Sequence, residues 1–447
     1  MKIAFLRVAM LCIATLGAAT DVVTAQTSPS LFGAPLPRPN GYDALIEAAQ
    51  NYRHGREGWP TNPTELSPAE NLRGQRYSVL RNSKALSQVR AALQIPLMRP
   101  APVVPLPQIP PPQAVPAGAE TGATQIPPPN RDPDAGGGEE GGEMLPEDAP
   151  FDPEDGFRLL GGLLKQESGF RASSGDWSGA MNSSLDCIQL GVVLTRGATF
   201  ETARLGHYLE NIGRSRLEPI VKKLDAASAA SAAARLQTIE TLRPPFADIV
   251  RLEKKLALER TVQAFEQLDW NDVVTWTRKP DGQNFSAEDS ATLLNSGQSE
   301  IQAQVSRVFD AAIAVAESPY DPQARISLLG ADAWTRMLAQ PLLSSRPRVE
   351  YLAQTAATAL LRSALEVESS LRKSGTLPAT LQTSFDPFAA ATGAGARLKY
   401  RLEGTSFRLY SVGPNGKDDG GIPLSLLAET EITSATPGDL VAPNFAG

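Results

Sequence analysis

Hydrophobic residues recur every three or four positions through most of the region from Pro153 to about Leu343, which predicts amphipathic helices. The first stripe breaks at Gly175-Asp176, and the second ends near Gly197. Asp225 is placed as the N-cap of an alanine-rich helix, which Pro244-Pro245 ends. The first two stripes consist of Phe157, Leu160, Leu163, Leu164, Trp177, Met181, Leu185, Ile188 and Val192. We therefore expect a helical domain over residues 154–345.

Two helices joined by a Gly-Asp turn, with small and bulky residues interleaved, are typical of a tetratricopeptide-like hairpin. The region has no clean 34-residue period, however. The sequence thus predicts a mainly α fold, an irregular helical array that is tetratricopeptide-like at most. An ordinary all-α domain without repeats explains the same pattern.

A shorter helical pattern precedes this domain and assigns residues 26–95 to an N-terminal helical segment. Its apolar positions are Tyr42, Leu45, Ile46 and Tyr52, then Leu80, Leu86, Val89 and Leu93 after a break at residues 60–63. Because two helices alone bury little apolar surface, we expect this pair to pack on something larger.

The C-terminal region changes from helix to strand. A long amphipathic helix runs from Val349 to Leu371 and stops at Lys373-Ser374-Gly375. Alternating residues at 397–402 and 407–412 then flank a Glu403-Gly404 turn, which predicts a hairpin. We expect an α+β module over residues 346–422 and a flexible tail over 423–447.

Proline is concentrated in one stretch, because 16 of the 37 prolines lie between Pro96 and Pro153. Residues 131–155 contain ten Asp or Glu and one Arg, a net charge of -9. Such a segment buries too little apolar surface to offset its ordering entropy. We interpret residues 96–153 as a disordered linker that acts as a spacer; a ligand for a proline-reading domain and a cation-binding segment are alternatives.

The chain begins with the pattern of a secretory signal peptide over residues 1–25. Lys2 and Arg7 precede twelve mostly apolar residues, and Val23-Thr24-Ala25 offers a cleavage site. Leu11 before Cys12 argues against a lipoprotein signal. We expect an exported protein, periplasmic or extracellular, without a stable transmembrane helix after cleavage; an uncleaved leader would anchor it to the membrane.

The charge balance argues against nucleic-acid binding. The net charge is -7, from 42 Lys and Arg against 49 Asp and Glu. Subtracting the -9 of residues 131–155 leaves about +2 for the remainder, with no basic stripe. Two histidines and two cysteines are also few for a zinc site.

The order of features from Arg348 to Gly421 resembles the C-terminal half of the major pseudopilin of type II secretion systems. These features are the helix, Leu377-Pro378, Asp386-Pro387-Phe388, the hairpin and a glycine-rich loop over residues 413–421. Behind a secretion signal and a helical body, this ending also resembles a group of uncharacterised envelope proteins of planctomycete-type bacteria. The resemblance implies architecture and brings little chemistry.

The long helix departs from a working pseudopilin. A pilin helix begins as a continuous apolar segment, whereas this one carries Arg348, Glu350, Gln354, Arg362, Glu366 and Glu368. It also lacks a prepilin-type leader in front of it. The sequence therefore favours a pseudopilin-like module reused for capping or docking.

The glycine-rich loop is a candidate calcium site, since the corresponding pseudopilin loop can hold calcium. Asn415, Asp418 and Asp419 supply oxygens, but calcium needs six to eight. The alternative is an Asx-type turn in which these side chains accept from local backbone N–H groups. By the same reasoning, we interpret Asp386 as a turn residue before Pro387.

One segment resembles the catalytic region of lytic transglycosylases. Glu167-Ser168-Gly169-Phe170 is followed by Gly179-Ala180 at a matching distance, which would make Glu167 a general acid. Met181-Asn182-Ser183 replaces the rest of the second motif, and no Tyr-Asn-Ala-Gly segment follows. The simpler interpretation places Glu167 on the exposed side of a helix.

The remaining candidates for catalysis are weaker. His54 and His207 are interpreted as surface or satisfied core residues, and Cys187 as an inert core thiol. We expect a non-catalytic binding or scaffold protein of the cell envelope. A peptidoglycan-cleaving enzyme that uses Glu167, and a subunit associated with a pseudopilus or secretion assembly, are the alternatives.

Overall fold

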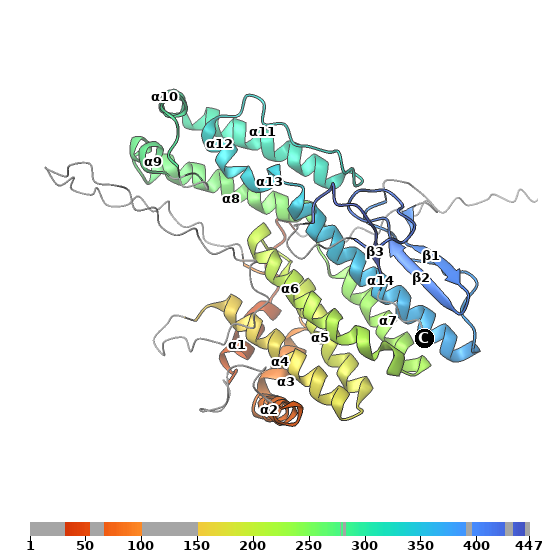
Figure 1. Cartoon of the computed structure of the whole chain (residues 1–447). Helices are drawn as coiled ribbons and strands as arrows, with labels where there is room; N and C mark the ends of the chain where they lie inside the picture. The colour runs from red at the N-terminus through yellow and green to blue at the C-terminus, as the bar shows by residue number, and fades with distance from the viewer. Residues whose placement is uncertain are drawn as a thin grey trace, which may run out of the picture.

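Helices make up most of the chain that the structure describes, together with one small antiparallel sheet (Figure 1). The computed structural model describes residues 32–53, 67–100, 151–277, 279, 283–389, 396–424 and 432–442. The predicted leader, residues 101–150 of the predicted linker and His54 lie outside the described residues. The expectation of a mainly α fold with a small C-terminal sheet is confirmed.

Three N-terminal helices pack against the helices that follow the linker. They are α1 (Gly41–Gln50), α2 (Pro68–Arg81) and α3 (Ser83–Ala92). Their apolar residues share one buried cluster with α4 (Pro153–Ser173), α5 (Trp177–Leu194) and α6 (Phe200–Leu217). The prediction that the N-terminal helices pack on something larger is confirmed. Leu80 is an exception at 62% exposed, because it belongs to α2 and not to the helix of Leu86 and Val89, and on α2 the neighbouring Val79 is the buried residue.

The two ends of the stretch over residues 101–150 lie side by side. Arg99 forms an ion pair with Glu154 at 2.8 Å, and the Arg99 backbone N–H donates to the Arg196 carbonyl. The helices before and after the stretch share one core, so the predicted linker interrupts a single helical body.

The α5–α6 pair is held at close range by glycines. A Cβ atom at Gly191 would lie 2.4 Å from the Gly206 carbonyl oxygen, and one at Gly213 would lie 2.7 Å from the Ser184 carbonyl oxygen. The two backbones thus approach each other without side chains between them. This contact aligns α5, which faces α4, with α6, which faces the C-terminal helix.

A second part of the same body forms around α14 (Arg346–Ser374). It packs along α7 (Ala226–Thr241), which follows the short 3-10 helix η2 (Glu218–Lys223). The expected N-cap is confirmed, since Asp225 accepts from the Ser228 backbone N–H at 2.7 Å. The expected stop of the long helix is also confirmed, because Gly375 caps α14 with a φ of 74°.

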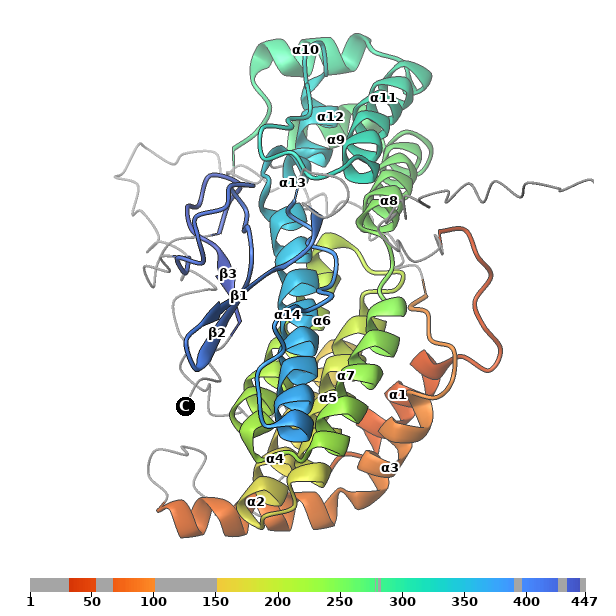
Figure 2. The same ribbon diagram turned by 90° about the vertical axis from the view of Figure 1, so that its right-hand side faces the viewer.

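The sheet covers one side of α14 (Figure 2). Strands β1 (Lys399–Glu403) and β2 (Ser406–Ser411) form the expected hairpin, with Leu402 opposite Phe407. A third strand, β3 (Leu440–Val441), pairs antiparallel with β2. The prediction of a flexible tail from residue 423 is therefore wrong for β3, whose backbone hydrogen bonds tie it to the sheet. Leu398, Phe407 and Leu409 lie in one apolar cluster with α5, α7 and α14.

The remaining helices form an upper lobe with its own core (Figures 1 and 2). They are α8 (Phe246–Glu266), α9 (Trp270–Trp276), α10 (Ala287–Asn295), α11 (Gln298–Glu317), α12 (Ala333–Leu338) and α13 (Gln340–Leu343). Trp334 is fully enclosed and donates its indole N–H to the Thr261 hydroxyl at 3.0 Å. The region 154–345 thus contributes to three large apolar clusters: one shared with the N-terminal helices, one shared with α14 and the sheet, and that of the upper lobe.

Among the described residues, none of the helices combines the length and apolar character that a membrane crossing needs.

Candidate functional site

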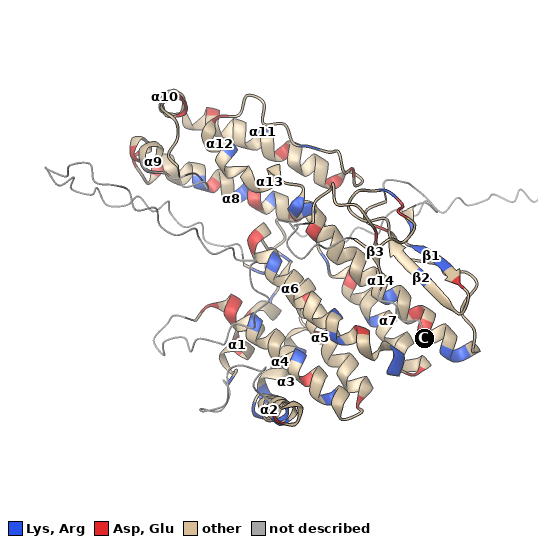
Figure 3. Ribbon diagram, in the orientation of Figure 1, with Lys and Arg blue, Asp and Glu red and all other residues tan. Residues whose placement is uncertain are grey.

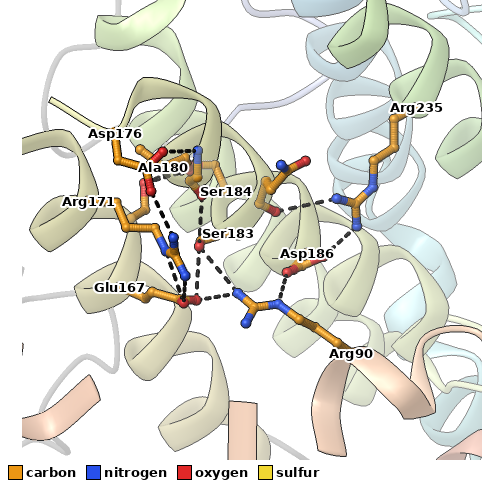
Figure 4. A network of polar contacts seen from close by, with 12 residues as sticks. Arg90, Glu167, Arg171, Asp176, Ala180, Ser183, Ser184, Asp186 and Arg235 are labelled. Carbon is orange, nitrogen blue, oxygen red and sulfur yellow. Dashed lines mark hydrogen bonds and ion pairs between the residues drawn. The ribbon is translucent and has the colours of Figure 1, made fainter. Parts of the chain in front are cut away.

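Glu167 is buried at the interface of three helices and is only 2% exposed. It lies on α4 and faces α3 and α5 (Figure 4). The interpretation that Glu167 lies on the exposed side of its helix is therefore wrong. The reason is that its partner Arg90 comes from a helix 77 positions earlier, which the local pattern around Glu167 does not reveal.

Both carboxylate oxygens of Glu167 are occupied by donors. Oε1 accepts from Nε and Nη2 of Arg171, at 3.1 and 2.9 Å. Oε2 accepts from the Ser183 hydroxyl at 2.9 Å and from Nη2 of Arg90. Two guanidinium groups and one hydroxyl thus surround this carboxylate and donate to both of its oxygens.

The network continues outward from the two arginines (Figure 4). Nε of Arg90 lies 2.8 Å from Oδ2 of Asp186, whose Oδ1 lies 2.5 Å from Nη2 of Arg235. Arg171 also pairs at 2.8 Å with Asp176, which caps α5 through the Gly179 backbone N–H. The network therefore ties α3, α4, α5 and α7 together through charged side chains.

The cations of this network are stabilised by their carboxylates. Burial works to lower the pKa of Arg90, but the hydrogen bonds that Arg90 donates to Asp186 and Glu167, and the charges of these carboxylates, outweigh it and raise the pKa. The pKa of Arg171 is raised in the same way, against burial, by Asp176 and Glu167. A general acid must hold a proton and reach a substrate oxygen. The oxygens of Glu167 instead accept hydrogen bonds from the guanidinium groups of Arg90 and Arg171. This arrangement supports helix packing and does not favour glycosidic bond cleavage.

Replacing Glu167 by glutamine is expected to lower the free energy of unfolding by about 1–2 kcal/mol. The loss stays moderate because Arg90 and Arg171 are each 37% exposed and can regain hydration. Urea unfolding followed by circular dichroism measures it, with Glu259→Gln on α8 as the control, because the Glu259 side chain is 44% exposed and lies 3.7 Å from Lys255. Muropeptide release that disappears in the Glu167 variant, with stability unchanged, would show a catalytic role instead.

The side-chain oxygens of the candidate calcium loop already accept hydrogen bonds from nearby N–H groups. Asn415 accepts from the Lys417 N–H at 2.9 Å, and Asp418 accepts from the Gly420 N–H at 3.0 Å. Asp419 accepts from the Asn415 amide and from the Gly438 N–H. The described residues contain no group of three or more His, Cys, Asp or Glu side chains placed to hold a metal ion. The geometry is that of the Asx-type turn, the alternative that the sequence left open.

The loop is fixed by a residue that sequence reasoning missed. Asp439 is fully buried and accepts from the N–H groups of Gly421, at 2.6 Å, and Asp419, at 3.3 Å. It stands beside β3, a two-residue strand too short to produce an alternating pattern. No sequence signal therefore pointed to this carboxylate.

Asp386 is a turn residue, as expected, and also holds the end of the hairpin. It accepts from the Phe388 N–H within the turn, and from the Ser411 hydroxyl and the Val412 N–H beyond β2. Burial raises the pKa of this carboxyl group, while these donors act to lower it. All its contacts are structural.

A second buried ion-pair cluster lies between α6 and α14, and sequence reasoning missed it. Glu210 is completely enclosed and receives both terminal nitrogens of Arg243, at 3.0 and 2.5 Å. Arg214 approaches the same carboxylate at 3.4 Å and donates to the Thr358 hydroxyl at 3.1 Å. The Arg243 guanidinium also lies 5.7 Å from the ring centroid of Tyr351. Glu210 and Arg214 stand four residues apart, a spacing that an ordinary exposed helical ion pair also has, so the local pattern does not indicate burial.

His207 and Cys187 are core residues. Cys187 is buried with a free thiol, and burial raises its pKa to about 12, as expected of an inert group. His207 lies beside the Glu210 cluster, with its ring 6.1 Å from that of Tyr351. Burial lowers the pKa of His207 to about 4, and the charges of Arg243, Arg214 and Arg204 act in the same direction against Glu210.

His207 is expected to make the fold sensitive to acid. Its folded-state pKa of about 4 lies below the ordinary value of 6.5, so the unfolded chain binds the proton more tightly. The neutral ring contributes its full stability above pH 6.5, and this contribution is lost progressively as the pH falls toward 4. Denaturant unfolding at pH 7.5 and 4.5 should show a smaller loss for His207→Gln than for the parent protein. An equal loss in both would exclude His207 as the cause.

An open groove lies between α8 and α11, with a volume of about 900 Å³. Its apolar lining includes Leu258, Val262 and Ile313. The charged residues at its rim pair with one another, as Lys254 does with Asp310 at 2.7 Å. Phe32, at the start of the described chain, also lines this groove, whereas Glu167 does not.

Comparison with known proteins finds no matching family model, no matching curated protein and no matching solved structure.

Proposed function

We propose that this chain is a non-catalytic binding or scaffold protein of the cell envelope. The observation that carries the proposal is the α8–α11 groove, an open, apolar recess on a lobe with its own core. Its carboxylates and amines are already paired, so it offers apolar surface for recognition and no free acid or base for catalysis.

Phe32 indicates what kind of partner suits the groove. This residue belongs to the segment that rises from α1 toward α8 (Figure 2), and its aromatic ring lines the recess. An aromatic ring thus forms part of the wall, against which apolar or aromatic side chains of a partner segment would pack. We infer that the partner is an envelope protein that presents such a segment.

Location and relationship rest on sequence patterns. The predicted leader supports export, and the order of features in residues 346–422 supports a pseudopilin-like module used for docking. The hairpins formed by successive helices support a likeness to tetratricopeptide arrays, which are commonly binding surfaces. Positive and negative side chains are interspersed along the helices (Figure 3), which favours a protein partner over a nucleic acid.

The two alternative functions are less well supported. A transglycosylase would need Glu167 as a proton donor, and its oxygens face Arg90 and Arg171. A pseudopilus subunit would need α14 in a filament core, but α7 and the sheet already cover this helix.

The proposal is tested by affinity capture from envelope fractions. We expect the parent protein to retain a partner that Val262→Glu, at the groove, loses at least tenfold. Leu329→Glu is the matched control, because Leu329 is 90% exposed and lies outside the groove. Capture of no partner, or equal capture by both variants, would contradict the proposal. Muropeptide release by the purified protein would favour the enzymatic alternative.

A further inference from the structure

The outer face of α2 presents apolar and cationic side chains to solvent. Leu72, Tyr77 and Leu80 are 36%, 43% and 62% exposed, and Arg73 and Arg76 between them are also exposed. The opposite face packs toward α4, where the Gln75 side chain lies beside Gly169. This outer face therefore forms one continuous stripe along the helix.

The arginines of this face stand apart from the others described above. Neither Arg73 nor Arg76 forms an ion pair with any carboxylate of the described residues, whereas Arg90, Arg99 and Arg171 all do. Glu70, on the same helix, is engaged by Ser67 in the N-terminal capping box. The charge of Arg73 acts on Glu70 three residues earlier, but neither arginine is in direct ion-pair contact with a carboxylate of the described residues. The face thus combines exposed apolar surface with two guanidinium groups that remain open to solvent.

The chain itself contains a segment of complementary chemistry. Residues 132–148 contain seven Asp or Glu and no Lys or Arg, a net charge of -7. Met144 and Leu145 stand among these acids and supply apolar side chains. Carboxylates for the arginines and apolar groups for the leucines therefore occur in one short sequence.

The longer stretch that contains this acidic segment is attached close enough to α2 for the segment to reach it. The Arg99–Glu154 pair fixes both ends of residues 101–150 at the start of α4. From Glu154 to Gly169, where α2 crosses, the helix rises about 22 Å. The ten residues before Phe151 span up to about 35 Å when extended. Tethering also raises their effective concentration at α2 to the millimolar range.

Other occupants fit less well. A second copy of α2 would place arginine opposite arginine. An anionic lipid surface would be repelled by the acidic segment attached beside it. A separate acidic protein would have to compete with a segment that is already tethered.

We propose that the acidic segment over residues 132–148 docks on the outer face of α2 and masks it. The inference is independent of the α8–α11 groove. Because charge attraction holds the segment on α2, raised salt or a more strongly bound acidic partner would release it, and the mask is reversible.

The mask is tested first in the parent protein. Hydrogen exchange of residues 69–81 should be slower at 50 mM than at 500 mM salt by at least fivefold. It should also be slower than in a variant whose residues 132–148 are replaced by an equal length of Gly-Ser. Equal exchange in the parent protein and the Gly-Ser variant would overturn the proposal. Neither measurement requires a substitution in the helices and strands that the structure describes.

Binding in trans provides the second test. A fluorescein-labelled peptide of residues 132–148 should bind the Gly-Ser variant at least tenfold more tightly than the parent protein. Arg73→Glu with Arg76→Glu in the Gly-Ser variant should abolish binding. The matched control is Lys223→Glu with Arg260→Glu, the same charge change at exposed positions elsewhere. Equal loss in both double variants would mean unspecific attraction and would overturn the proposal.

Vesicles distinguish a masked face from an open one. Vesicles with 30% phosphatidylglycerol should bind the Gly-Ser variant and not the parent protein. Equal binding of these vesicles to both proteins would show an unmasked, lipid-facing surface and would overturn the proposal.

Discussion

Replacing Glu210 by glutamine is expected to lower the free energy of unfolding by about 3–5 kcal/mol. The carboxylate is fully enclosed, and its partners Arg214 and Arg243 are each only 5% exposed. Without the carboxylate, two cations would remain buried with no compensating charge. Urea unfolding monitored by circular dichroism measures the loss. Glu201→Gln, an exposed position on the same helix, should change the unfolding free energy by less than about 0.5 kcal/mol.

The pH response of Glu210 provides an independent check. Burial acts to raise its pKa, but Arg243 and Arg214 outweigh it and hold the pKa below the ordinary 4.5. A lowered carboxyl pKa contributes stability above pH 4.5, and this stability is lost as the pH falls through the folded-state value. The parent protein should therefore lose more stability below pH 4.5 than Glu210→Gln does. A Glu210→Gln variant as stable as the parent protein would contradict the burial of this cluster.

Replacing Gly191 by alanine is expected to lower the free energy of unfolding by about 2–3 kcal/mol. Helix propensity alone predicts the opposite sign, since alanine in a helix is favoured over glycine by about 1 kcal/mol. The new Cβ would lie 2.4 Å from the Gly206 carbonyl oxygen and 2.7 Å from the Glu210 backbone nitrogen. Backbone cannot move aside as a flexible side chain does, so α6 would have to shift.

Gly162 on α4 is the matched control for Gly191. A Cβ atom there would meet nothing within 4 Å. Gly162→Ala should therefore stabilise the protein by about 0.5–1 kcal/mol through helix propensity. Thermal and urea unfolding of the two variants should move in opposite directions. A stabilised Gly191→Ala would mean that α5 and α6 are not in backbone contact.

Local features of the fold could be predicted from the sequence because their causes are local. Asp225 caps α7 through a backbone N–H three residues on, and Gly375 ends α14 in a conformation that favours glycine. The apolar stripes around Leu160 and Leu185 also become core. In each case, the residues that produce the structure lie within one or two helical turns.

Features that depend on distant partners could not be predicted in this way. The burial of Glu167 depends on Arg90, and that of Glu210 on Arg243, 33 positions away. Strand β3 exists because it pairs with β2 and has only two residues of its own. A charged residue in a helical pattern resembles a solvated one until its partner is placed beside it.

The Arg99–Glu154 junction makes the acidic, proline-rich stretch an insertion within a connection between two neighbouring helices. The closure entropy of a chain connection grows slowly with its length, by only about 0.6 kcal/mol for each doubling. Evolution can therefore lengthen, shorten or recompose this stretch while the helical body keeps its architecture. The same tolerance makes it a suitable place to graft a foreign epitope or reporter into the protein.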